Sequence, residues 1–93
     1  MPVVQLPRSL VDLFPGAERR VELDATSVDE VVAELERRWP GMRDRLCDSS
    51  STLRAYIHIY VDGERAGLET PVAPTSVVLV LPAVAGGSGR SPR

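Results

Sequence analysis

Several residue types that common protein chemistries require are scarce or missing from this chain of 93 residues. A single cysteine rules out an internal disulfide. The chain also has a single histidine, and one cysteine with one histidine cannot form a metal site. Lysine and asparagine are absent, a bias that a GC-rich genome explains. Without lysine, the chain cannot be extended through isopeptide bonds to its own side chains.

Long apolar runs are missing as well. No run approaches the ~20 residues of a membrane helix, and no charged segment followed by an apolar one forms a leader. We therefore expect a soluble, cytoplasmic protein with no membrane partner. A hydrophobic share of 43% supports one small core, so neither a second domain nor a deep catalytic pocket is expected.

Positive charge is in the minority. Arg90 and Arg93 lie near the C-terminal end, and the rest of the chain has nine arginines against 13 acidic residues, a charge of −4. Nucleic-acid binding depends on clustered cations that neutralise phosphates, so nucleic acid is not an expected partner. A protein partner with a basic face fits the acidic body better.

Two short β-prone segments open the chain. The first, residues 3–6, is followed by Pro7, which closes it. The second, residues 20–24, alternates polar and apolar side chains, as a half-buried strand does. We predict that these segments pair. The link between them, residues 8–19, holds several apolar side chains that are expected to cover one end of the core.

The clearest helix signal begins at Ser27, which has the spacing of a capping box with Glu30. Glu34 is expected to pair with Arg38 one turn later, and the Pro-Gly pair at 40–41 ends the helix. An apolar stripe at helical spacing faces the core: Val28, Val31, Val32, Leu35 and Trp39.

The second half of the chain indicates a loop followed by three strands. Residues 42–53 are polar and serine-rich, which indicates a loop that could hold a turn of helix, with Leu46 as an anchor. Asp62 and Gly63 predict a hairpin with a short returning strand, and residues 76–81, nearly all apolar, predict a central, covered strand. Residues 55–61 alternate strictly, with one side carrying Ala55, Ile57, Ile59 and Val61 and the other Tyr56, His58 and Tyr60.

The order of elements predicts the fold class. Strand, strand, helix, strand, short strand and strand give an α+β domain, in which one main helix packs on one face of a mixed sheet.

The C-terminal end is the most informative segment. The apolar run breaks at Pro82 and passes through residues 83–85 into Gly86 and Gly87, which a polar tail, residues 88–93, follows. Glycine accepts nearly any backbone conformation, so this end is expected to form a thin, flexible arm that can enter a narrow cleft of another protein.

The element order, the segment 57–63 and the end 81–87 together resemble the ubiquitin-like β-grasp sulfur carriers of the MoaD/ThiS group, most of all the CysO type. The resemblance covers residues 3–87. It implies a β-grasp domain over residues 1–85, a reactive di-glycine at 86–87 and a disordered extension over 88–93 that is removed.

The resemblance also implies a function. In such carriers a ubiquitin-activating-type enzyme uses ATP to adenylate the terminal glycine, which then becomes a thiocarboxylate and gives sulfur to a biosynthetic enzyme. Carried onto this chain, the reactive carbonyl belongs to Gly87, and Val84, Ala85 and Gly86 form the flexible arm. The sequence shows no nucleophile paired with a base, so the chain is expected to be a carrier without a bound cofactor rather than an enzyme. A carrier that visits several enzymes should bind each of them weakly, so a monomer is expected.

Two departures from the family pattern stand out. Residues 73–75 replace the Gly-Asp turn that many members carry before the last strand. More importantly, Gly87 is still joined to Ser88, so Gly87 has no free carboxylate. Three explanations of residues 88–93 are open. They could be a pro-segment that a JAMM-type metalloprotease cuts off between Gly87 and Ser88, or an artificial extension. They could also mark a protein that kept the fold and lost the chemistry.

Other readings stay open at this point. Tyr56, His58 and Tyr60 form a candidate partner face, although a solvated strand face explains them too. Cys47 has no second cysteine or histidine near it in sequence, which favours an incidental thiol over a sulfur relay. The acceptor could serve cysteine, molybdopterin, thiamine or specialised sulfur metabolism. Alternatively, Gly87 could be conjugated to target lysines, or the domain could be a plain interaction module.

Overall fold

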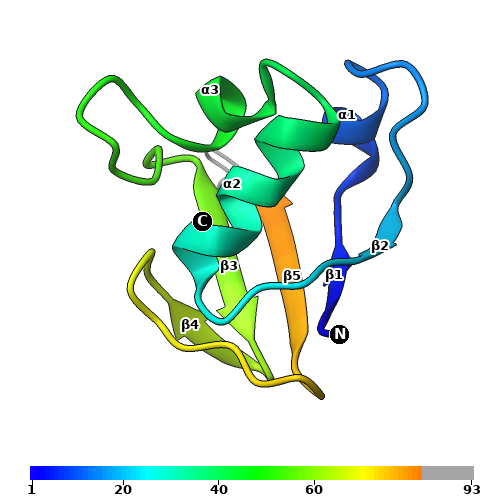
Figure 1. Cartoon of the computed structure of the whole chain (residues 1–93). Coiled ribbons are helices and arrows are strands. Elements are labelled where there is room, and N and C mark those ends of the chain that lie inside the picture. The colour runs from blue at the N-terminus through cyan, green and yellow to red at the C-terminus, as the bar shows by residue number, and fades with distance from the viewer. Residues whose placement is uncertain (83–93) are drawn as a thin grey trace, which may run out of the picture.

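The computed structural model describes residues 1–82, in which one long helix crosses a five-stranded sheet (Figure 1). The helices are α1 (Arg8–Val11), α2 (Val28–Arg38) and α3 (Met42–Leu46). The strands are β1 (Val3–Gln5), β2 (Arg20–Glu22), β3 (Ile57–Val61), β4 (Glu64–Ala66) and β5 (Val77–Pro82).

The sheet is mixed, with strand order β2-β1-β5-β3-β4. The central strand β5 runs parallel to β1 and antiparallel to β3, whereas the two outer pairs are antiparallel. The predicted α+β class, the pairing of the first two strands and the central place of the last strand are all confirmed.

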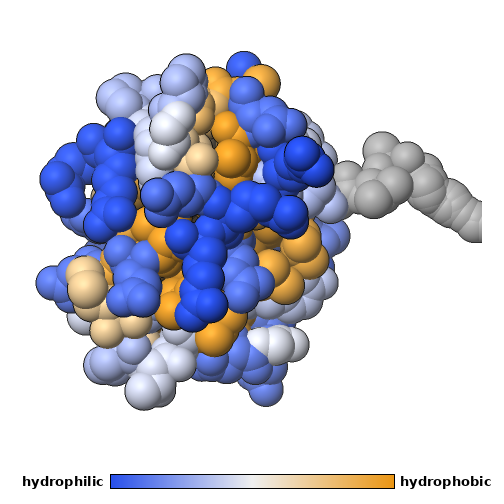
Figure 2. All heavy atoms as spheres, turned by 90° about the vertical axis from the view of Figure 1, so that its right-hand side faces the viewer, coloured by the Kyte–Doolittle hydropathy of each residue, from blue (hydrophilic) through white to orange (hydrophobic). Residues whose placement is uncertain are grey.

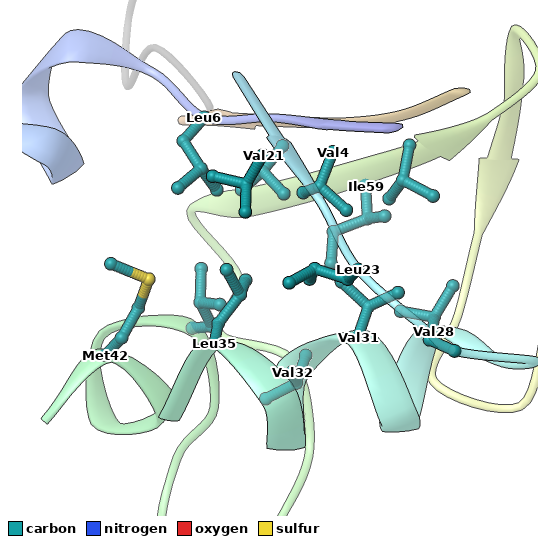
Figure 3. Close-up of a cluster of buried hydrophobic side chains, with 14 of the residues drawn as sticks. Val4, Leu6, Val21, Leu23, Val28, Val31, Val32, Leu35, Met42 and Ile59 are labelled. Atoms are coloured by element: carbon teal, nitrogen blue, oxygen red, sulfur yellow. The ribbon is translucent and has the colours of Figure 1, made fainter. Parts of the chain in front are cut away.

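The core lies between α2 and one face of the sheet. Val31 and Leu35 on the helix point toward Val4 and Ile59 on the strands, and all four side chains are fully buried (Figure 3). Val78 and Val80 of β5 are buried on the same face, where Val4 pairs with Val78 and Ile59 with Val80. The apolar stripe predicted for the helix is therefore the core face of α2, with Trp39 partly buried at its end.

The start of α2 differs slightly from a standard capping box. The Glu30 backbone N–H donates to the Ser27 hydroxyl at 3.2 Å, as predicted. The Glu30 carboxylate, however, accepts from the backbone N–H and the hydroxyl of Thr26, at 2.7 and 2.8 Å, one residue before the cap. These bonds lower the pKa of Glu30, the backbone bond being the larger cause.

The predicted pair of Glu34 with Arg38 is wrong. Glu34 instead forms a salt bridge with Arg37 at 2.7 Å. Arg38 donates to the backbone carbonyl of Glu22 at 3.3 Å, so its side chain ties α2 to the end of β2. Side chains three or four residues apart on a helix can both come into contact, so Glu34 could pair with either arginine. The Glu22 carbonyl binds Arg38, which leaves Arg37 as the partner of Glu34.

Two linking segments hold short helices, of which the sequence indicated only one, as a turn of helix within residues 42–53. Between β1 and β2 the chain forms α1, whose Leu10 is buried, so this link does cover one end of the core. After α2 the chain forms the five-residue α3, anchored by the buried Leu46 as expected.

The strand β3 is shorter than predicted because a turn precedes it. The Ile57 N–H donates to the Arg54 carbonyl at 2.9 Å, and Ile57 opposite Pro82 is the first pair of the ladder with β5. Ala55 and Tyr56 therefore lie outside the strand, and Tyr56 does not belong to the row formed by His58 and Tyr60.

Gly41 joins α2 to α3 in a conformation that suits glycine alone. Its φ is +100°, and its N–H donates to both carboxylate oxygens of Glu36 at 3.1 Å. Glu36 also accepts from the Arg43 N–H at 2.9 Å, and these backbone bonds lower its pKa. A Cβ at Gly41 would lie 3.3 Å from Cε1 of Phe14.

Gly41→Ala is expected to lower the free energy of unfolding by about 1–3 kcal/mol, because alanine is strained at positive φ and would press on Phe14. Urea denaturation measures the change. Gly67→Ala is the matched control, since Gly67 has no positive φ and a Cβ there meets nothing within 4 Å. Equal urea midpoints for the two variants would contradict the strain argument.

Candidate functional site

The described chain stops at the base of the predicted arm. β5 ends at Pro82, which pairs with Ile57 of β3. The other predicted site residues lie outside the described residues: Val84, Ala85, Gly86, Gly87 and Ser88. Their roles therefore remain predictions, and the structure contributes the surfaces from which this end departs.

A hydrogen-bonded latch fixes where β5 begins. At the β3–β4 turn, the Asp62 carboxylate accepts from the Val77 N–H at 2.9 Å and from the Ser76 hydroxyl at 2.8 Å. The Asp62 N–H donates to the Val77 carbonyl at 2.9 Å. Asp62 has φ +52°, a left-handed value that aspartate tolerates better than most residues. The hairpin predicted at Asp62 and Gly63 thus also sets the register of the central strand.

The turn before β5 is closed without the Gly-Asp pair of the family pattern. The Ser76 N–H donates to the Ala73 carbonyl at 3.0 Å, and the Ala73 N–H donates to the Ser76 hydroxyl at 2.9 Å. Ser76 is buried, and its hydroxyl bonds to both Ala73 and Asp62. Residues 73–75 therefore keep the turn that β5 needs.

The sheet face away from α2 carries an apolar strip that the sequence did not reveal. Side chains from three strands line a groove of about 570 Å³, and we call this the open sheet face: Gln5, Tyr60, Val77, Leu79 and Leu81. Val77 and Leu81 are 42% and 38% exposed. β5 is thus central but covered on one face alone, which corrects the prediction of a covered strand.

The candidate aromatic face divides into two places. Tyr60 lies opposite Leu79 and is part of the open sheet face, and His58, opposite Leu81, is half-buried on the same side of β3. Tyr56, 51% exposed, lies instead in a groove with Leu13 at the end of the sheet. The structure therefore brings His58 and Tyr60 together and separates Tyr56 from them.

Cys47 lies at the end of α3 with 2% of its surface exposed. Burial raises the pKa of its thiol, which works against the thiolate that a sulfur relay requires. Within residues 1–82 no group of three or more His, Cys, Asp or Glu side chains is placed to hold a metal ion. None of the helices in that range is long and apolar enough to cross a membrane.

A mixed sheet with a parallel central pair, crossed on one face by one long helix, is the β-grasp arrangement of ubiquitin-like proteins. The model of the ThiS family matches residues 4–87. The chain belongs to the ThiS family, as the element order and the segments 57–63 and 81–87 predicted.

Similar sequences and structures agree with this placement. The sulfur carrier proteins CysO of Mycobacterium bovis and Mycobacterium tuberculosis are each 36% identical over 78 residues, 77% of this chain and 84% of theirs. The Amycolatopsis orientalis BexX/CysO complex matches at TM-score 0.81 and 32% identity, covering 94% of this chain and all of that one. Mycobacterium tuberculosis CysO matches at TM-score 0.80 and 30% identity, covering 90% and 100%.

A more distant match, SAMP1 of Haloferax volcanii, has 24% identity and a TM-score of 0.73 over 92% of this chain and 98% of that one, and shows the fold alone. The predicted β-grasp fold is confirmed. The chain is a sulfur carrier protein of the CysO type, in a family that is typically non-catalytic.

The Asp62 latch predicts a dependence of stability on pH. The bond from the Val77 N–H, followed by that from Ser76, holds the pKa of Asp62 below its usual value. The stabilisation is therefore complete above the unfolded pKa of about 3.9 and is lost as the pH falls through the lower folded pKa. Asp62→Asn should be less stable than the unchanged chain at pH 7, and the difference should shrink below about pH 4.

Urea midpoints measured from pH 7 down to pH 2 test this expectation. Asparagine tolerates the positive φ of Asp62, so the variant removes charge while keeping the turn. Asp24→Asn is the control, because Asp24 is exposed and accepts no hydrogen bond from residues 1–82. A difference between Asp62→Asn and the unchanged chain that stays constant over the whole range would contradict the role of the charge.

Proposed function

We propose that this chain carries sulfur as a thiocarboxylate on Gly87, after residues 88–93 have been removed. The observation that carries the proposal is that the family match extends to Gly87 and ends at that second glycine. The CysO-type relatives support the same assignment.

The chemistry requires activation because a carboxylate is a poor electrophile. A Gly87 carboxylate oxygen would attack the α-phosphorus of ATP and release pyrophosphate, giving an acyl adenylate. Sulfide (HS⁻) would then attack the carbonyl carbon and expel AMP, and loss of the remaining proton would leave a thiocarboxylate on Gly87. Glycine suits both steps, because no side chain obstructs the approach of the enzyme.

Partners must supply every catalytic group. A ubiquitin-activating-type enzyme would provide the ATP site, a JAMM-type metalloprotease would cut between Gly87 and Ser88, and a sulfur-accepting biosynthetic enzyme would take the product. The complex of an Amycolatopsis orientalis CysO with BexX supports the idea of a dedicated protein partner. The open sheet face, with half-exposed Val77 and Leu81, would give these enzymes an apolar surface to dock on, with His58 and Tyr60 beside it.

The proposal can be tested by measuring the intact mass of the protein recovered from the organism that makes it. This mass determines both where the chain ends and whether sulfur is bound. We expect a mass that ends at Gly87, with a fraction heavier by the exchange of one oxygen for sulfur. A mass that ends uniformly at Arg93 would contradict the proposal and favour a plain interaction module. A branched product with Gly87 joined to a target lysine would instead identify a protein modifier.

Gly87→Ala in the chain ending at residue 87 is expected to abolish adenylation, because the added methyl group would stand beside the reacting carbonyl in a site shaped for glycine. ATP–pyrophosphate exchange with the activating enzyme of the same organism measures this step. The control is Gly67→Ala, after β4, where a Cβ meets nothing within 4 Å. This variant should support ATP–pyrophosphate exchange at the normal rate. Full exchange by Gly87→Ala would overturn the assignment of Gly87.

A further inference from the structure

We propose that the end of the molecule where β5 leaves the sheet is a second docking surface, which receives an acidic rim around the active-site entrance of the adenylating enzyme. We call it the exit surface, and its residues are Leu13, Arg19, Arg20, Arg45, Arg54 and Tyr56. This inference rests on the proposed function, because it names how the enzyme that activates Gly87 recognises the carrier.

Two connected grooves form one side of the exit surface. A groove of about 240 Å³ contains Pro82, the last described residue, together with Leu13, Arg45 and Tyr56. The same three side chains also line a neighbouring groove of about 480 Å³, which adds Arg54. The concave surface therefore extends from the end of β5 across α1 and α3.

A third groove lies on the other side of the end of β5. It has a volume of about 290 Å³, shares Pro7 with the first groove, and is lined by Arg19 and Arg20 next to residues 79–81. Figure 2 looks onto the β2 side of the molecule and shows strongly hydrophilic residues (blue) with apolar ones (orange) between them. The point where the chain leaves the sheet is thus bordered by arginines on both sides.

The charge of this surface is opposite to that of the protein. The residues that line the three grooves include four arginines and one acidic residue, Asp44, whereas the chain as a whole has a net charge of −2. Four arginines close together at one end of an acidic protein give that end a positive local field. The partner at this end is therefore acidic, in contrast to the basic partner that composition alone indicates.

Most of these arginines have no partner among the described residues. Arg19, Arg20 and Arg45 are exposed, and the two salt bridges within residues 1–82 involve neither them nor Arg54. The Nε of Arg54 donates to the Asp44 carbonyl at 2.7 Å, which holds that guanidinium in place. Exposed arginines without intramolecular partners can bind acidic groups of another protein without first breaking a salt bridge of their own.

Two apolar side chains at the centre give the surface an anchor. Leu13 and Tyr56 are 50% and 51% exposed, and they line the same two grooves. The Leu13 N–H donates to the Leu10 carbonyl at 3.1 Å, so the position of Leu13 is fixed by the buried Leu10. A half-exposed tyrosine and leucine enclosed by charged residues is the composition of an interface core with a polar rim.

Chain length identifies the occupant. Gly87 follows Pro82 by five residues, so its carbonyl can lie at most about 18 Å from the end of β5. An enzyme that holds this carbonyl in its active site therefore has the entrance of that site against the surroundings of Pro82. The exit surface is the part of the carrier that faces such an entrance.

The test compares charge reversals in the chain ending at Gly87, using the ubiquitin-activating-type enzyme encoded in the same genome and ATP–pyrophosphate exchange. Arg20→Glu and Arg45→Glu, made separately, should each raise the KM for the carrier about threefold to tenfold and leave kcat unchanged. High salt should reduce the difference, because it screens exposed charges. Arg65→Glu on β4 is the control, since it is exposed, makes the same charge change and lies outside the three grooves.

Each outcome has a distinct meaning. A KM that rises equally in all three variants would reflect overall charge, and a KM that rises in none of them would mean that these arginines do not contact the enzyme. Either result would overturn the exit surface and leave the proposed function intact. No exchange by the unchanged chain ending at Gly87 would overturn the proposed function and this inference together. Equal urea midpoints for the variants confirm that the comparison concerns docking rather than folding.

Discussion

The burial of the apolar stripe of α2 against β5 and its neighbours is the interaction on which the rest of the structure depends. Val31 and Leu35 are fully buried on the helix, as are Val78 and Val80 on the strand. Each such side chain contributes about 1.5–3 kcal/mol relative to exposure. One sheet covered on one face by the long helix α2 gives residues 1–82 a single core, and β5, at the centre of that sheet, is also the strand from which residues 83–93 continue.

This double use of β5 explains where the functional surfaces lie. One face of the strand belongs to the core, the other contributes Val77, Leu79 and Leu81 to the open sheet face, and its end borders the exit surface. Under the proposed function, a partner that takes the C-terminal end would therefore meet an apolar surface on one side and arginines around the end of β5. Apolar contact favours affinity, whereas the charges favour fast and selective encounter.

Sequence predicted best those elements whose pattern is periodic. The stripe of α2 and the alternation of residues 57–61 lead directly to the observed helix and strand. It predicted poorly where side chains on both faces are apolar: in β5 the exposed Val77 and Leu81 cannot be told by pattern from the buried Val78 and Val80. Tyr56 was misplaced because the alternation extends back through it, although a turn from Arg54 to Ile57 delays the start of the strand to Ile57. The exit surface joins α1, β2 and α3, so no local pattern encodes it.

The position of β5 also has a mechanical consequence. Hydrogen bonds hold the strand on both sides, to β1 and to β3, and the Asp62 latch fastens its first residue. Under the proposed function, a partner that draws the C-terminal end into its active site would pull on the end of β5. Such a pull loads the bonds on both sides together in shear, instead of opening them one after another as it would at the free end of an edge strand. The domain is therefore expected to resist such a pull better than one whose C-terminal strand lies at the edge of its sheet.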